Sequence, residues 1–339
     1  MVVDLSHWSS RPKRVLLAGD LLVDRYIHGK VSRISPEAPV PIVQVDGRQA
    51  PEVRMGGSGN ALMNLAALGA QVDLLGRIGD DSAGELFLDL LAEAALSSEA
   101  LVREPGWPTP LKERIMANGQ QLVRVDYEQS RPLSRQLEEE LIGQLPGRLE
   151  GIDLVVISDY GKGFLTERLL AQLIAQARRG NLPIVADPKG RRFSRYNGVT
   201  LLKPNVAETY AAAAVDPSCS LEEAAWALLD GLELDQLMVT RAEEGISLFS
   251  PTGQVSHHPT QVHQVRDVTG AGDTVLATVA MALSHGHSYQ EGALLANVAA
   301  GIAIEQLGCA VVTLAELQAR LRASSEIRSQ SGVISPSSQ

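Results

Sequence analysis

The chain alternates short apolar runs with longer amphipathic stretches, and this alternation limits its possible folds more than any other feature. The apolar runs, each about the length of one buried strand, are residues 14–20, 70–79, 152–159, 182–188, 199–205 and 234–241. Between them lie stretches such as 165–180, LTERLLAQLIAQARRG, whose leucines recur at helical spacing. Strands separated by helices predict βαβ units and a mainly parallel sheet with helices on both faces, an α/β fold.

Two segments interrupt this alternation. Residues 26–47 and 107–127 are rich in turn formers, lack helical periodicity and are typical of extended hairpins. The second segment contains Asn118-Gly119, a strong hairpin signal. We expect the two segments to form a small β-sheet apart from the main sheet, which could act as a lid.

Composition and charge narrow the function class. The 339 residues are 45% hydrophobic, so a substantial core is possible, and the net charge of −10 with scattered basic residues argues against a nucleic-acid or membrane surface. No apolar run is long enough to span a membrane, and the N-terminus lacks the apolar region of a signal peptide. The two cysteines, Cys219 and Cys309, have no metal-binding spacing and fit a reducing compartment. We expect a soluble, cytoplasmic protein.

Polar residues stand at or just after the ends of several predicted strands. They are Asp20, Asp24, Asp159, Asp187, Asn205 and Thr240. In an open α/β sheet, ligands bind outside the carboxyl ends of the strands, so these side chains would meet at one edge of the sheet. Any one of them could instead end a strand or cap a helix, but their number favours a site.

The stretch DVTGAGDTV, residues 267–275, indicates how such a site could work. Gly270 and Gly272 allow a tight turn with outward amides, and a helix is predicted from Asp273 to Ser284. Amides at a helix N-terminus can bind a phosphoryl group, while Asp273 can accept a hydroxyl proton. From the residues alone, this interpretation and plain helix capping are evenly matched. The sequence contains neither a Walker-type loop nor a complete GxGxxG, so a nicotinamide enzyme is disfavoured.

Two motifs carry a resemblance to a known family. DVTGAGD resembles the C-terminal signature of the ribokinase-like (PfkB) carbohydrate kinases, and residues 55–85, MGGSGNALMNLAALGAQVDLLGRIGDDSAGE, resemble their N-terminal signature. The resemblance covers about residues 12–322. It implies a three-layer ribokinase-like fold with a small β-sheet lid, flanked by flexible termini at 1–11 and 323–339, where the second tail is rich in Ser.

Three stretches are similar to one branch of that family, the kinases of D-glycero-D-manno-heptose 7-phosphate. They are residues 32–45, residues 118–128, and SDYGKGFL with ADPKG at 158–165 and 186–190. The resemblance implies transfer of the ATP γ-phosphoryl group to the C1 hydroxyl, toward a nucleotide-activated heptose for lipopolysaccharide core or a related glycan. We expect a separate nucleotidyltransferase downstream, because the chain has no room for a fused one.

Other readings stay open. A family member acting on a fructose phosphate, ribose or a nucleoside would keep the DVTGAGD chemistry. A non-catalytic sugar- or nucleotide-binding regulator would keep the fold alone.

The resemblance also implies a role for individual residues. Asp273 matches the catalytic base, and the amides of Gly270, Ala271 and Gly272 match the anion hole. The residues that match sugar-binding positions are Asp24, Gly56, Gly57 and Asn60. The residues that match ATP and magnesium positions are Asn205, Glu208, Thr240, Arg241, Gly245 and Asn297, with Asn205 and Glu208 organising Mg²⁺ and its waters. Asp267 matches a signature that in many members accompanies a monovalent cation, so K⁺ is a further candidate.

A phosphorylated sugar needs cations to balance its charge under a closing lid. The candidates are Arg33, Lys112, Arg114, Lys162 and Lys189. Lys162 and Lys189 are favoured because they follow the strand-end residues Asp159 and Asp187. Asp187 itself is also predicted to bind the sugar. The exposed face of the lid could also pair two subunits, so a homodimer is expected.

Overall fold

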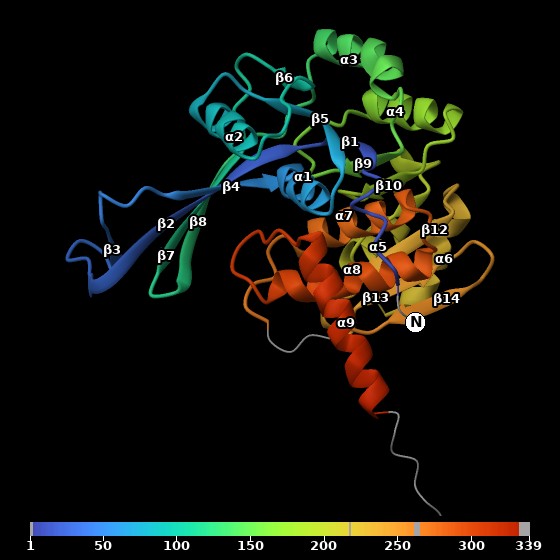
Figure 1. Cartoon of the computed structure of the whole chain (residues 1–339). Helices are drawn as coiled ribbons and strands as arrows, with labels where there is room; N and C mark the ends of the chain where they lie inside the picture. The colour runs from blue at the N-terminus through green and yellow to red at the C-terminus, as the bar shows by residue number, and fades with distance from the viewer. Residues whose placement is uncertain (1–2, 217, 261–264, 332–339) are drawn as a thin grey trace, which may run out of the picture.

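A large sheet forms the centre of the computed structural model, which describes residues 3–216, 218–260 and 265–331 (Figure 1). In that part of the chain its strands follow the order β14-β13-β12-β11-β10-β9-β1-β5-β6. Their bounds are β1 Arg14–Gly19, β5 Gln71–Ile78, β6 Leu101–Arg103, β9 Leu154–Ser158, β10 Ile184–Asp187, β11 Leu201–Leu202, β12 Gln236–Thr240, β13 Ile246–Phe249 and β14 Val255–His258. The strands from β6 to β12 are parallel, whereas β13 and β14 run antiparallel to their neighbours. The predicted mainly parallel α/β sheet is confirmed.

Helices cover both faces of this sheet. Their bounds are α1 Ser58–Ala67, α2 Ser82–Glu93, α3 Arg135–Arg148, α4 Glu167–Arg179, α5 Val206–Ala213, α6 Leu221–Gly231, α7 Ala271–Ser284, α8 Tyr289–Ile304 and α9 Leu314–Ser331. Short 3₁₀ turns lie at Phe193–Tyr196 and Ala242–Glu244. The three layers of the predicted fold are therefore present.

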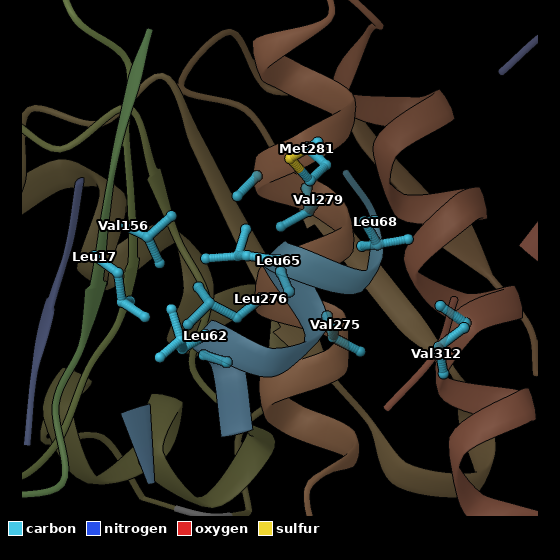
Figure 2. Close-up of a cluster of buried hydrophobic side chains, with 14 of the residues drawn as sticks. Leu17, Leu62, Leu65, Leu68, Val156, Val275, Leu276, Val279, Met281 and Val312 are labelled. Atoms are coloured by element: carbon cyan, nitrogen blue, oxygen red, sulfur yellow. The ribbon is translucent and has the colours of Figure 1, made fainter. Parts of the chain in front are cut away.

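The alternation of side chains along β1 explains the layers. Val15 and Leu17 belong to the hydrophobic core shared with α1, α7 and α8, while Leu16 and Ala18 belong to the core on the opposite face, shared with α3, α4 and α6. Because both faces are buried at the centre of the sheet, β1 and β9 are continuous apolar runs rather than alternating ones. Figure 2 shows the first core where sheet and helices meet, with the labelled side chains Leu17, Val156, Leu62, Leu65, Leu276 and Val279.

A second sheet extends away from the body, on the left of Figure 1. It consists of β2 Leu21–Ile34, β3 Pro41–Val45, β4 Glu52–Gly57, β7 Leu111–Ala117 and β8 Gln120–Tyr127, and we call it the lid sheet. The predicted hairpin joins β7 to β8, where Asn118 and Gly119 both have positive φ, 52° and 78°. β2 connects the two sheets along the chain, since it begins one residue after β1 ends and pairs with β3, β4 and β7 of the lid sheet.

The chain ends differ from the expectation of flexible termini. Val3, Leu5 and Trp8 are buried in the core that α7 and α8 share. Trp8 also stacks on His285, at the end of α7. At the other end, α9 continues to Ser331, past the boundary expected at 322. The serines in this stretch argue against a helix, although Ala323, Glu326, Arg328 and Gln330 favour one. Residues 332–339 lie outside the described part. No described helix has the length and apolar character needed to cross a bilayer.

Candidate functional site

Asp273 lies at the start of α7, where the two glycines place it. Gly270 is the N-cap residue and has a φ of 80°, a conformation that favours glycine. A Cβ on Gly270 would also clash with the side-chain nitrogen of Asn60. The amides of Ala271 and Gly272 therefore lie in the first turn of α7, a long buried helix. This end of the helix carries the positive end of its dipole.

The Asp273 carboxylate is held from two directions. Its Oδ2 accepts a hydrogen bond from Asn60 Nδ2 at 3.0 Å, and its Oδ1 accepts one from the hydroxyl of Tyr160 at 2.7 Å. Asn60 comes from α1, which packs against α7, and Tyr160 follows β9. The Asp273 side chain does not cap the helix, so helix capping alone does not account for it.

Burial dominates the electrostatics of Asp273, which is 4% exposed. Desolvation raises the pKa of Asp273 to about 7, against the lowering effect of the hydrogen bonds from Asn60 and Tyr160. The charge of Asp187 raises this pKa further and that of Lys203 lowers it. A carboxylate with a pKa near neutrality can both accept and release a proton.

A buried ammonium group lies beside the glycine turn. Lys203 Nζ forms an ion pair with Asp187 Oδ2 at 2.9 Å, and the Lys203 side chain is 4% exposed. A Cβ placed on Gly272 would be 3.7 Å from this Nζ, so the charge adjoins the first turn of α7. The structure thus combines amides, a cation and a proton acceptor in one place.

A cavity of about 950 Å³ opens next to this turn. Its lining brings together five residues predicted for the nucleotide, Asn205, Thr240, Arg241, Gly245 and Asn297, with Ala271 and Gly272. Much of the remaining lining is apolar, with Val268, Val275 and Ile304 among it. Its size and its mixture of apolar surface with a few polar groups suit a nucleotide-sized ligand.

Glu208 and Asn205 form a capping box at the start of α5. Asn205 Oδ1 accepts from the Glu208 amide at 2.8 Å, and Glu208 Oε2 accepts from the Asn205 amide at 3.1 Å. Glu208 Oε1 also pairs with Lys189 Nζ at 2.8 Å. Lys189 was predicted for the sugar, but the structure places its ammonium on Glu208 instead. These oxygen donors suit Mg²⁺, which keeps several waters and needs only one or two carboxylates.

Asp24 lies at the root of the lid sheet, on β2. It is buried and pairs with Arg114 of β7. A Cβ on Gly56 would overlap the Asp24 carboxylate, which explains the glycine at this position of β4. Cys309 Sγ lies 3.5 Å from Asp24 Oδ2. Burial raises the pKa of Cys309, and the charges of Asp24 and Asp273 raise it further. The predicted sugar-binding and catalytic aspartates therefore face the same space.

Two of the cations predicted for the sugar phosphate, Arg33 and Lys162, make no contact with Asp24 in the structure. Arg33 is exposed near the outer end of β2, nine residues beyond Asp24 on the same strand, which corresponds to about 30 Å. At this distance along the strand, Arg33 does not lie beside Asp24 of the same chain. Lys162 Nζ pairs with Glu128 at 2.6 Å. Lys112, whose Nζ lies 4.0 Å from Asp126, is on the lid sheet next to Asp24 in register.

Two of the strand-end acids have a structural role. Asp20 accepts hydrogen bonds from the backbone amides of Tyr160, Lys162 and Phe164, at 3.0, 3.0 and 3.1 Å. Asp159 accepts from the Tyr196 hydroxyl at 2.6 Å. For these two acids the structural alternative holds, because the loop after β9 binds Asp20 and Tyr196 binds Asp159.

Asp267 and Asn297 also bind neighbouring loops. Asp267 accepts from the amides of Thr269 and Gly308, both at 2.9 Å. Although burial opposes it, these hydrogen bonds lower the pKa of Asp267. Asn297 donates to the carbonyl of Pro259 at 2.8 Å, so its amide shapes one wall of the cavity. Within the described residues, no group of three or more His, Cys, Asp or Glu could hold a metal ion.

Two residues of the site were not predicted. Lys203 lies inside the apolar run 199–205, two positions before Asn205, and Tyr160 directly follows the run 152–159. The sequence signal for both is a hydrogen-bonding or charged side chain at the end of a predicted strand.

Comparisons with known proteins concern the family and the fold. A family model described as pfkB family carbohydrate kinase matches residues 32–315. Among the solved structures, phosphofructokinase-2 from Escherichia coli in complex with potassium has a TM-score of 0.76 and 19% identity, covering 93% of this chain and 100% of that one. Ribokinase from Arabidopsis thaliana, complexed with ribose and ATP, has a TM-score of 0.69 and 18% identity, covering 92% and 99%. At these identities the likeness concerns the fold.

Sequence relatives are more similar. The chain is 45% identical over 306 residues to the bifunctional protein HldE of Trichlorobacter lovleyi, and 46% identical over 314 residues to that of Hyphomonas neptunium. These alignments cover 90% and 91% of this chain but 62% and 63% of the relatives. The chain thus spans less than two thirds of the length of these relatives.

Proposed function

Because the chain belongs to the pfkB family of carbohydrate kinases, we propose that it transfers the γ-phosphoryl group of ATP to the C1 hydroxyl of D-glycero-D-manno-heptose 7-phosphate, giving the 1,7-bisphosphate. The observation that carries phosphoryl transfer is the buried Asp273, with its pKa raised to about 7, at the positive end of α7 beside a nucleotide-sized cavity. The choice of heptose rests on the quoted stretches and on the similarity to the HldE proteins.

In the proposed reaction the sugar lies between Asp24 and Asp273, and ATP lies in the cavity on the other side of the glycine turn. Asp273 takes the proton from the attacking hydroxyl as the oxygen attacks the γ-phosphorus, while the bond from the γ-phosphorus to the β,γ-bridging oxygen breaks and ADP leaves. The amides of Gly270, Ala271 and Gly272 and the ammonium of Lys203 stabilise the negative charge on the phosphoryl group. The lid sheet would exclude water, which otherwise competes as acceptor.

Metal ions are part of the proposal. Asn205 and Glu208 would hold Mg²⁺ through its waters, and bound Mg²⁺ would neutralise phosphate charge. A monovalent cation, K⁺ for example, would bind backbone oxygens of the loops that Asp267 ties together. Activity that is equal in potassium and in choline salts would remove this second ion from the proposal.

Lid residues supply the cations for the sugar's own phosphate. Arg114 and Lys112 lie on β7, in register with Tyr26 and Asp24 of β2, so their side chains share a face with Asp24. Because Arg114 already pairs with Asp24, a bound sugar would have to share or replace that contact. A nucleotidyltransferase that acts later would complete the route to an activated sugar.

The first test of this function is ³¹P NMR with MgATP and a panel of heptose 7-phosphate, fructose 6-phosphate, fructose 1-phosphate and ribose. A new anomeric phosphate resonance with the heptose alone is expected. Turnover of another sugar instead would keep the kinase and overturn the heptose assignment. ADP formation with none of them would count against the kinase proposal for these acceptors and favour a binding role.

We further propose that two chains pair through the lid sheet. Val123, Val125 and Tyr127 alternate along β8 and so share one face, where they are 50%, 37% and 52% exposed. Such an apolar surface is typical of an interface. The double substitution V123E/V125E is expected to convert a dimer to a monomer in light scattering. A particle whose mass does not change, or a wild-type monomer, would contradict this pairing.

A further inference from the structure

Tyr160 makes the shortest hydrogen bond to the carboxylate of Asp273. Its hydroxyl lies 2.7 Å from Oδ1, while Asn60 Nδ2 lies 3.0 Å from Oδ2. Each oxygen of Asp273 therefore has one fixed donor, which sets the rotation of the carboxylate. Burial and the neighbouring Asp273 charge raise the pKa of Tyr160 well above its usual range, so the phenol keeps its proton and donates.

The loop that carries Tyr160 is fixed independently of Asp273. Asp20, directly after β1, accepts the backbone amide of Tyr160 and two further amides of the same loop. Gly163, with a φ of 94°, lies so close to the backbone of Arg131 that a Cβ there would clash. The loop that carries the phenol is thus held by Asp20, which follows β1, and β1 lies next to β9 in the sheet.

We propose that Tyr160 is a positioning residue for the base Asp273: its hydroxyl orients the carboxylate and stabilises the ionised form that accepts the sugar proton. This inference rests on the proposed function. The phenol donates its hydrogen bond throughout and is not consumed. When Asp273 takes the proton, the hydrogen bond from Tyr160 weakens, which favours release of that proton after transfer.

The pH dependence of turnover gives the readout. The titratable groups that face Asp273 are Tyr160, Asp187, Lys203 and Cys309. Only ionised Asp273 can accept the proton, so kcat/KM is expected to rise with pH and level off above about 7, near the pKa of Asp273. Since the Tyr160 hydrogen bond lowers this pKa, its loss must move the rising limb to higher pH.

The experiment is a pH profile of kcat/KM for Tyr160→Phe beside the wild type. The rising part of the profile is expected to move to higher pH by about one unit or more. This shift corresponds to about a tenfold loss of kcat/KM near neutral pH, which is recovered at alkaline pH. The KM for ATP should not change, because Tyr160 is not among the residues of the cavity lining. Tyr196→Phe is the matched control, since its phenol donates to Asp159 and not to Asp273.

A second variant covers the case in which Tyr160→Phe folds poorly. Site-specific 3-fluorotyrosine at position 160 makes the phenol a stronger donor, so the limb is expected to move to lower pH. A folding defect would not produce shifts in opposite directions. An unmoved limb in the folded variants, with an active wild type and an inactive Asp273→Asn, would overturn the role of Tyr160 alone. An inactive wild type would instead overturn the proposed function.

Discussion

Replacing Asp273 with asparagine is expected to lower kcat by at least about 10² to 10⁴, the typical contribution of a general base. Asparagine has the same shape and can still accept a hydrogen bond from Asn60 or Tyr160, but it cannot take the hydroxyl proton. Binding of ATP should persist, because Ala271 and Gly272 line the nucleotide cavity and Asp273 does not. Steady-state kinetics and calorimetric titration with an ATP analogue measure the two effects separately.

The control for this substitution is a measurement of folding stability. The unfolding midpoint of Asp273→Asn should be at least that of the wild type near neutral pH, because the substitution removes a buried acid whose ionised form is disfavoured. Turnover close to the wild-type value would exclude Asp273 as the base. A large loss of ATP affinity would place Asp273 in nucleotide binding instead.

Replacing Lys203 with methionine is expected to lower kcat by about 10² to 10³, the usual effect of removing one donor that stabilises charge in a transition state. Methionine keeps the volume of the side chain and removes the ammonium. The substitution also leaves Asp187 without its buried partner, which should destabilise the fold by up to about 3 kcal/mol. Chemical denaturation and steady-state kinetics give the two quantities.

A double variant separates catalysis from stability. In K203M/D187N both charges are absent, so most of the lost stability should return. Turnover should stay low, since the cation beside Gly272 is still missing. If K203M alone keeps turnover within about threefold of the wild type, the pair is structural only, and the phosphoryl charge is stabilised without Lys203.

How much of the site the sequence revealed depends on the range of each interaction. The glycine turn and the helix of 267–284 are local, and so are the capping box of Asn205 and Glu208 and the hairpin at Asn118-Gly119. Each of these follows from residues a few positions apart. The position of the nucleotide cavity could also be predicted in part, because the carboxyl ends of parallel strands meet at one edge of the sheet.

The ion-pair partners of the charged residues could not be predicted from the sequence. The candidates for the sugar phosphate were Arg33, Lys112, Arg114, Lys162 and Lys189, and the sequence favoured Lys162 and Lys189 among them. The structure places Arg33 near the outer end of the lid sheet, Arg114 on Asp24 and Lys189 on Glu208. Ion pairs between distant elements depend on strand order and on side-chain direction, and a local pattern carries neither.

The sequence by itself determined the α/β fold, the separate lid sheet and the amide turn before Asp273, because hydrophobic periodicity and backbone preference act over short distances. The tertiary structure alone decided what surrounds Asp273. Asn60 lies 213 positions away in the chain and Tyr160 lies 113 positions away, and both reach the carboxylate only through the packing of α1 on α7 and the neighbouring strands β1 and β9. Burial by these same elements raises the pKa of Asp273 toward neutrality.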